Sequence, residues 1–279
     1  MLLLGGWWDP HLLGILDLWQ RSTAAGGAPE LHIGPASHLQ WWPQAQRLML
    51  HFFDRHLKLS TEVPSSAASP RFWNQTSHEW QDSPRTTEHC WQLQGDGLTS
   101  TDPESGTLES HEPGQGTVTI VHDPWRPVPA IGGHLSPDAG PAERSRIDQR
   151  TDVATFTGCE LMQPLQLQGQ PVLTLLASAD QPGFDLCVAL SRLPRDSSQV
   201  QQLSTGVLRV SGDDARTLLL RRIRLQPLLA TLLPGDRLRI SIAGAAWPAV
   251  GVNPGTPEVA SGAPGSRHRV VTMTLDLAG

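Results

Sequence analysis

Three segments in the second half of the chain carry apolar side chains at every second position, and this period limits the possible folds more than any other feature. It places the apolar side chains on one face of a β-strand, whereas a helix needs a spacing of three or four residues. The 26 glycines and 24 prolines provide turns between such strands. We therefore expect a β-sandwich over residues 70–279. The alternating apolar positions are Phe184, Leu186, Val188 and Leu190, then Leu238, Ile240 and Ile242, and finally Val271, Met273, Leu275 and Leu277.

Residues 1–60 follow a different pattern, in which short apolar strands alternate with helices. Strands are predicted at 2–4 and 30–33, and the dipeptide Gly34-Pro35 is expected to end the second one. Helices are predicted at 10–25 and at about 43–59, because apolar residues recur there at helical spacing. A small, polar linker at 61–69 separates this α/β region from the predicted sandwich.

Asp9 and His38 each follow one of the two predicted strands by a few residues. Neighbouring parallel strands bring such loops to one edge of the sheet, which is where α/β proteins place their sites. The two side chains are therefore expected within reach of each other. Taken alone, Asp9 also fits the N-cap of the helix that begins at Pro10, and His38 also fits an exposed loop histidine.

The charge and the hydropathy pattern exclude two classes of partner. The net charge is −6 and the isoelectric point is about 6.0, with no basic stripe of the kind that nucleic-acid binding requires. No apolar run approaches the roughly 18 residues that a membrane span needs. We predict neither a nucleic-acid partner nor a membrane partner.

The cysteines and histidines predict no cofactor and no metal. Cys90, Cys159 and Cys187 are widely spaced and match neither a zinc motif nor a disulfide framework, which favours reduced thiols in a cytoplasmic protein. A metal site would have to combine Asp9 with His11, His32 and His38. Their spacing matches no metal-binding motif. We therefore do not favour such a site.

An ordered set of motifs resembles the CocE/NonD hydrolases, which include esterases and, more distantly, X-prolyl dipeptidyl-peptidases. The resemblance implies that residues 1–60 are the C-terminal end of an α/β-hydrolase sheet. It implies that residues 70–279 are the jelly-roll β-sandwich that follows this sheet in the family. The motifs are Gly5-Gly6-Trp7-Trp8-Asp9-Pro10-His11, Ile33-Gly34-Pro35, Phe53-Asp54-Arg55-His56-Leu57-Lys58, His122-Asp123-Pro124-Trp125 and Leu233-Pro234-Gly235-Asp236.

The same resemblance makes Asp9 the acid and His38 the base of a Ser-Asp-His triad. In such a triad the histidine takes the proton of the serine hydroxyl, and the aspartate fixes the imidazole tautomer. The family carries its nucleophilic serine and its oxyanion donors in an upstream region. No Gly-x-Ser-x-Gly nucleophile elbow occurs in these 279 residues. Ser37 is not predicted to replace it, because adjacent residues rarely present the hydroxyl to the same ring.

Two functions remain open from the sequence. The first is the C-terminal portion of a serine hydrolase that cleaves an ester or amide of a small molecule or peptide, and that is inactive without an upstream hydrolase segment. The second is a non-catalytic β-sandwich that serves in binding or oligomerisation and carries a vestigial hydrolase remnant. Because two strands and two helices cannot cover both faces of a parallel sheet, we expect the isolated chain to aggregate or to form a homo-oligomer.

Overall fold

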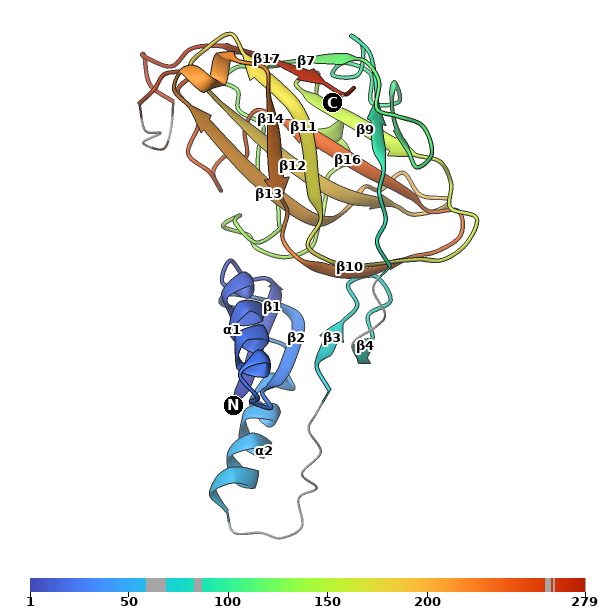
Figure 1. Ribbon diagram of the computed structural model, residues 1–279, viewed down its shortest axis with the longest axis vertical. Helices are drawn as coiled ribbons and strands as arrows, with labels where there is room; N and C mark the ends of the chain where they lie inside the picture. Colours follow the sequence, from blue (N-terminus) through green and yellow to red (C-terminus); the bar gives the residue numbers. More distant parts are fainter. Residues whose placement is uncertain (59–68, 83–86, 259–261, 263, 279) are drawn as a thin grey trace.

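The computed structural model describes all residues except 59–68, 83–86, 259–261, 263 and 279. A large β-sandwich lies above a small α/β unit that contains the N-terminus (Figure 1). The predicted linker at 61–69 falls almost entirely outside the described residues. The fold is mostly β-sheet, arranged in several sheets, as the alternating pattern predicted.

The N-terminal unit is built on strands β1 (Leu2–Trp8) and β2 (Glu30–Ser37), which pair in parallel. Helix α1 (Leu12–Ala24) connects them and packs on one face, in a cluster that includes Leu3, Trp7 and Ile33. Helix α2 (Ala45–Leu57) follows β2, and its first residue belongs to a cluster with Leu4 and Trp42 on the opposite face. The helices therefore sandwich the two strands, because successive side chains of a strand point to opposite faces.

Strand β2 differs from the prediction because it continues through Gly34-Pro35 to Ser37. Gly6 pairs with Gly34 and Trp8 pairs with Ser37, so β2 carries one extra residue at this point, a β-bulge. A bulge tolerates proline, which has no N–H to contribute to the ladder. Gly34 is needed here because a Cβ would collide with the indole ring of Trp42.

The sheet of this unit also contains residues within the range that we predicted as sandwich. Strand β3 (Arg71–Trp73) pairs in parallel with β2, and β4 (Trp80–Asp82) pairs antiparallel with β3, in the order β1-β2-β3-β4. The chain therefore returns to the first sheet after residue 70 before it enters the sandwich. Strands β3 and β4 have three residues each, too few to show the alternation of apolar and polar side chains that predicts a strand.

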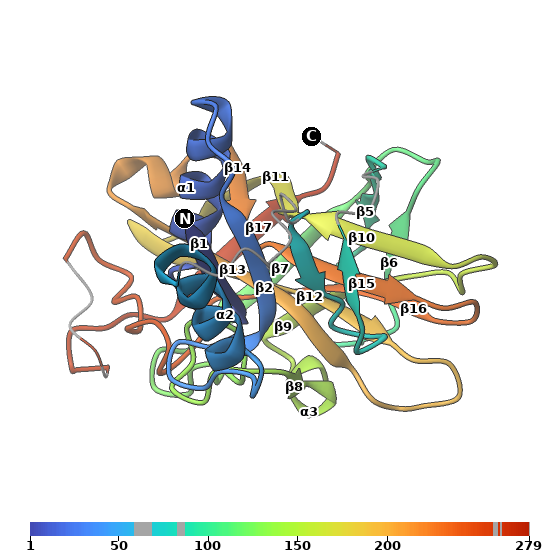
Figure 2. The same ribbon diagram turned by 90° about the horizontal axis from the view of Figure 1, so that it is seen from below.

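The sandwich consists of a seven-stranded and a four-stranded sheet with one continuous hydrophobic core between them. Figure 2 shows its strands from below. The larger sheet has the order β5-β6-β9-β16-β12-β13-β8 and the smaller has the order β14-β11-β17-β7, while β10 and β15 form a separate pair. The strands of the larger sheet are β5 (Gln92–Gln94), β6 (Gly106–Glu109), β8 (Ala142–Glu143), β9 (Val153–Gly158), β12 (Gly183–Leu193), β13 (Gln201–Ser211) and β16 (Arg237–Ala243). The remaining strands are β7 (Thr117–His122), β10 (Leu165–Gly169), β11 (Val172–Ala179), β14 (Leu219–Arg224), β15 (Leu228–Leu232) and β17 (Val271–Asp276), and two short helices are α3 (Ser145–Asp148) and η1 (Asp213–Arg216).

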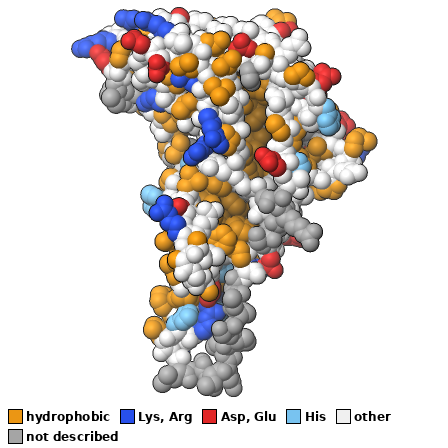
Figure 3. Space-filling view, in the orientation of Figure 1, with side chains coloured by type: hydrophobic (Ala, Val, Ile, Leu, Met, Phe, Trp, Pro, Cys, Tyr) orange, Lys and Arg blue, Asp and Glu red, His pale blue; other side chains and the backbone are white. Residues whose placement is uncertain are grey.

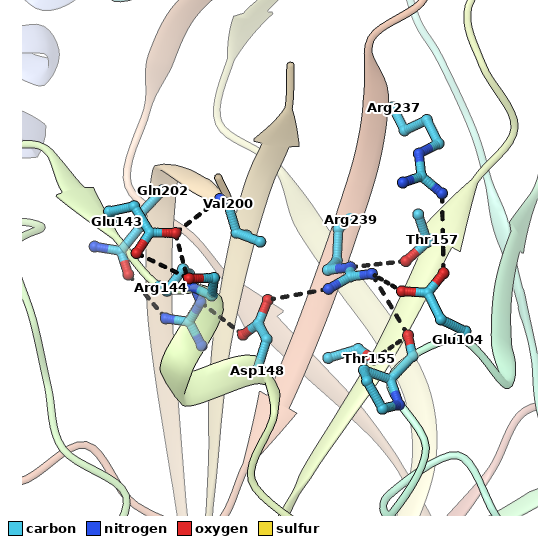
Figure 4. Close-up of polar contacts among 12 residues, drawn as sticks. Glu104, Glu143, Arg144, Asp148, Thr155, Thr157, Val200, Gln202, Arg237 and Arg239 are labelled. Carbon is cyan, nitrogen blue, oxygen red and sulfur yellow. Dashed lines mark hydrogen bonds and ion pairs between the residues drawn. The ribbon is translucent and has the colours of Figure 1, made fainter. Parts of the chain in front are cut away.

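A chain of ion pairs, buried except at Glu104, runs along one side of the larger sheet (Figure 4). Asp148 of α3 accepts a hydrogen bond of 3.0 Å from Nε of Arg144, and its other carboxylate oxygen lies 3.8 Å from Arg239 of β16. Arg239 also donates to Thr157 Oγ1 at 2.7 Å and to Glu104 at 3.1 Å. One buried carboxylate therefore serves two buried guanidinium groups.

The two units are joined by apolar packing and by hydrogen bonds. Leu229 of β15 belongs to the same hydrophobic cluster as Trp7 and Phe72 of the N-terminal unit. Asn74, which follows β3, donates to Thr231 Oγ1 of β15 at 2.8 Å. The sandwich therefore covers part of the apolar surface that the small sheet cannot cover itself.

Candidate functional site

Asp9 and His38 lie at the same edge of the small sheet, directly after β1 and β2. The parallel register brings the carboxyl ends of both strands together, as the sequence predicted. Asp9 Oδ1 lies 3.4 Å from Nδ1 of His38. The Asp9 side chain is only 4% exposed, whereas the His38 ring is 58% exposed and open to a further group.

The turn after β1 fixes the Asp9 carboxylate. Its Oδ1 accepts the backbone N–H of His11 at 2.8 Å, and its carbonyl accepts the N–H of Leu12 at 3.1 Å. This side-chain bond is the one expected of an N-cap aspartate. The described helix nevertheless begins at Leu12, two residues later than predicted, with His11 in the N-cap position. The carboxylate thus stabilises the turn while it faces His38.

Gln226 of the sandwich holds this turn from the other side, a contact that was not predicted from the sequence. Its Nε2 donates to the carbonyl of Asp9 at 2.8 Å. Gln226 is itself buried, with its own N–H bonded to Thr205 and its carbonyl bonded to Ser204. The contact spans 217 positions of sequence, so no local pattern could have identified it.

The structure separates one of the four candidate metal ligands, His32, from the other three. Asp9, His11 and His38 lie together, and the ring centroids of the two histidines are 5.0 Å apart. His32 instead lies in the middle of β2, where it is buried against the ring of Trp80. Burial, with a smaller effect of the Arg71 charge, lowers the pKa of His32.

Ser37 is not placed as a nucleophile. It is buried, and its Oγ accepts the N–H of Gln40 at 3.2 Å, which closes the loop that carries His38. Its backbone N–H also bonds to the carbonyl of Gln40. Ser37 therefore shapes the histidine loop, in agreement with the expectation that it does not serve His38.

We expect His134, which contacts Thr205 of β13, to make the stability of the protein depend on pH. Its Nδ1 is 3.3 Å from Thr205 Oγ1, and burial lowers the pKa of His134 to about 4. The unfolded chain would bind this proton with a pKa near 6.5. The unfolded state therefore holds more protons between these values, and stability falls as the pH drops from 6.5 towards 4.

The expected loss from His134 is on the order of 3 kcal/mol across that range. His134→Gln should make the dependence of the unfolding free energy on pH shallower, measured by urea denaturation at several pH values. A residual dependence is expected because burial also lowers the pKa of His122. If parent and variant curves stay parallel from pH 6.5 to 4, His134 does not carry this effect.

Two of the cavities formed by the described residues lie in the sandwich, and neither is lined by Asp9 or His38. The larger has a volume of about 480 Å³ and an apolar wall that includes Leu167, Leu173 and Leu228. Gln168 also lines it, and its buried Oε1 has no hydrogen-bond partner among the described residues. The smaller cavity, about 50 Å³, lies against β12 and β13. No helix in the described part of the chain is long and apolar enough to cross a membrane.

Comparison with known proteins gives matches over nearly the whole chain. Residues 55–274 match the family model of the X-Pro dipeptidyl-peptidase C-terminal non-catalytic domain, a stretch that excludes Asp9 and His38. A cocaine esterase from Rhodococcus sp. (strain MB1 Bresler) is 27% identical over 207 residues, which is 70% of this chain and 35% of the esterase. The chain thus spans about a third of the length of this curated relative.

Solved structures extend the likeness to the N-terminal unit. An aminopeptidase from a marine sediment archaeon (Thaumarchaeota archaeon) matches 99% of the chain with 52% of its own length, at 21% identity and a TM-score of 0.79. An α-amino acid ester hydrolase matches 99% of the chain with 53% of its own length, at 20% identity and a TM-score of 0.78. A CocE/NonD family hydrolase from Staphylococcus aureus matches 99% of the chain with 51% of its own length, at 12% identity and a TM-score of 0.62. At these identities the matches show a shared fold, and the likeness includes the region around Asp9 and His38.

Proposed function

Because the chain belongs to the family of the X-Pro dipeptidyl-peptidase C-terminal non-catalytic domain, we propose that it is the C-terminal portion of a serine hydrolase. In this proposal, residues 1–60 together with β3 and β4 are the end of an α/β-hydrolase sheet, and the chain from β5 onward is a jelly-roll sandwich. The observation that carries it is the Asp9–His38 pair, a buried carboxylate facing an exposed imidazole at the carboxyl edge of two parallel strands.

Asp9 and His38 have the roles of acid and base in this hydrolase. The Asp9 carboxylate holds the proton of the imidazole on Nδ1, which leaves Nε2 free to accept the proton of a serine hydroxyl. His38 then returns that proton to the leaving alcohol or amine as the acyl-enzyme forms, and it activates water in the same way for deacylation. The serine and the oxyanion donors come from an upstream hydrolase segment.

The substrate class follows from the chemistry that the relatives share. Their names describe an esterase, an α-amino acid ester hydrolase and an aminopeptidase. Esters and amides are both cleaved at an acyl carbon, and a serine triad cleaves them by the same steps. We therefore propose a small ester or a peptide as the substrate.

The outer edge of β1 is the place where the upstream segment would join. In the described sheet β1 is the first strand of the order, so its outer edge is unpaired. An apolar parallel strand with a free edge tends to pair with another chain. A further parallel strand added here would extend the sheet and bring a nucleophile loop to the edge that carries Asp9 and His38.

The 279-residue chain alone should form no adduct with a serine-reactive fluorophosphonate. The reason is that no nucleophile elbow occurs in its sequence and that the Ser37 hydroxyl is bound within its own loop. Intact mass of the purified chain is the measurement, with His38→Ala alongside. A single adduct on the parent that disappears in the variant would mean that the chain holds its own nucleophile and would refute this division of roles.

The exposed face of α2 should make the isolated chain associate. Met49, Leu50, Phe53 and Leu57 are between 40% and 77% exposed and lie along one side of the helix. Figure 3 shows apolar side chains on the surface of the N-terminal unit, which contains α2. A contiguous exposed apolar patch drives self-association, so sedimentation should reveal species larger than the monomer that dissociate on dilution.

The double variant Phe53→Glu/Leu57→Glu should shift that equilibrium towards monomer by about tenfold or more, since two charges oppose burial of the patch. Met162→Glu is the matched control, because Met162 is an isolated apolar side chain of the sandwich, 88% exposed. Equal behaviour of the two variants would locate the association elsewhere. A monodisperse parent at all concentrations would contradict the prediction outright.

A non-catalytic binding module is the second candidate function, and the larger cavity of the sandwich favours it. Its volume of about 480 Å³ is within the range of small-molecule sites. Its apolar wall and the Gln168 Oε1, which accepts no hydrogen bond from the described part of the chain, suit a mostly apolar ligand with one hydrogen-bond donor. Under this alternative, supplying the upstream hydrolase segment yields no hydrolysis that depends on His38.

A further inference from the structure

Asp9, His11 and His38 bring one carboxylate oxygen and two imidazole nitrogens into a single group. The ligand atoms all lie within 4.8 Å of one another. His11 precedes α1, and the other two residues follow β1 and β2. The sequence showed no metal motif because the group is assembled by the parallel pairing of two strands.

The separation of Asp9 and His38 fits two ligands of one metal ion. Zinc binds histidine nitrogen and carboxylate oxygen at about 2.0–2.2 Å in tetrahedral geometry, which places neighbouring ligand atoms roughly 3.3–3.5 Å apart. The observed distance from His38 Nδ1 to Asp9 Oδ1 is 3.4 Å. The ligand atoms lie up to 4.8 Å apart, further than one bound ion allows. Because His11 is exposed, rotation of its ring can bring its nitrogen closer to the other two ligand atoms.

The charge of the site also favours a cation. Asp9 is buried, and within the described residues its carboxylate forms no ion pair with lysine or arginine, but only the contact with His38. A buried carboxylate is stabilised by an opposite charge or a metal. The His11 N–H and the Gln226 contact hold Asp9 in place, in the way that surrounding groups orient metal ligands.

We propose that Asp9, His11 and His38 form a binding site for a divalent transition-metal ion of the Zn²⁺ class. Two imidazoles and one carboxylate are a donor set of zinc and related ions, and three protein ligands leave a position for water. The site binds the metal whether or not the chain acts in hydrolysis. A bound ion occupies His38, so in the proposed hydrolase it would also remove the base and inhibit the reaction.

Titration of the purified 279-residue chain with Zn²⁺ by calorimetry, and with Co²⁺ by its visible absorption, tests the proposal. We expect one ion per chain and a Co²⁺ spectrum of tetrahedral or five-coordinate type. His11→Ala should weaken binding by about tenfold or more, since loss even of a supporting group costs 10–100-fold. Asp9→Asn should do the same. His51→Ala, an exposed histidine of α2, is the matched control and should retain the parent affinity.

The proposal is overturned if the parent binds no ion more tightly than His11→Ala, or if His51→Ala loses as much affinity as His11→Ala. Circular dichroism establishes that each variant is folded, and the exposed His11 side chain makes His11→Ala the safer of the two tests. The outcome is separate from that of the proposed function, because binding is measured without catalysis. Hydrolysis that depends on His38, in a chain that binds no metal, would leave only the metal proposal refuted.

Discussion

His38→Ala and Asp9→Asn should each lower kcat/KM of the assembled hydrolase by roughly 10³- to 10⁴-fold. The assembly is this chain joined to an upstream segment that bears a Gly-x-Ser-x-Gly elbow, and the readout is hydrolysis of a chromogenic ester. His38→Ala removes the proton acceptor of the serine. Asp9→Asn removes the negative charge that stabilises the imidazolium, while its amide oxygen can still accept the N–H of His11.

His51→Ala is the control for a general effect of losing a histidine, and it should keep the parent rate. If either site variant stays within about threefold of the parent kcat/KM, which corresponds to less than about 1 kcal/mol of transition-state stabilisation, the triad assignment is wrong. A measurement on the chain alone gives an independent check. Nitrogen chemical shifts of neutral His38 should report the proton on Nδ1 in the parent.

The sequence could predict those strands in which apolar and polar residues alternate within the strand itself. Strand β17 alternates buried and half-buried residues from Val271 to Asp276, because one face packs on the core and the other faces outward. In β12 the apolar positions were recognised, but Asp185 and Cys187 are buried as well. This strand is central, between β13 and β16, so its second face is covered by other parts of the chain that its own sequence does not reveal.

The candidate site could also be predicted only in part, because one part of it depends on a local sequence pattern and the rest on tertiary contacts. Two strands that each end in a polar loop predicted that Asp9 and His38 would meet, and they lie 3.4 Å apart. Gln226 was missed because tertiary packing alone brings it to the site. The bulge at Gly34-Pro35 was interpreted as a strand end, since a proline usually interrupts a ladder and only the partner strand shows that the pairing resumes.

Asp148→Asn should destabilise the sandwich by about 3 kcal/mol, the largest loss of stability that we expect from a single charge. Its carboxylate lies between the guanidinium groups of Arg144 and Arg239, and all three side chains are less than 10% exposed. Removing one partner of a buried ion pair leaves an uncompensated charge in a poorly solvating interior, which typically costs about 3–5 kcal/mol. We expect a value near the lower limit because the asparagine oxygen can still accept from Arg144, and because Arg239 keeps Glu104.

Asp17→Asn is the matched control, because Asp17 and Arg21 form an ion pair at the same i, i+4 spacing with a similar distance, 2.9 Å against 3.0 Å. The side chains of Arg21 and Asp17 are 78% and 55% exposed, and those of Arg144 and Asp148 are 9% and 1% exposed. Water screens the exposed pair, so its loss should cost about 0.5 kcal/mol or less. Thermal denaturation should therefore separate the variants by roughly 5–10 °C for a chain of this length. If Asp148→Asn and Asp17→Asn have the same melting temperature, burial does not increase the contribution of the Arg144–Asp148 ion pair to stability. The negative charge of Glu104 would then have to be sufficient for both guanidinium groups.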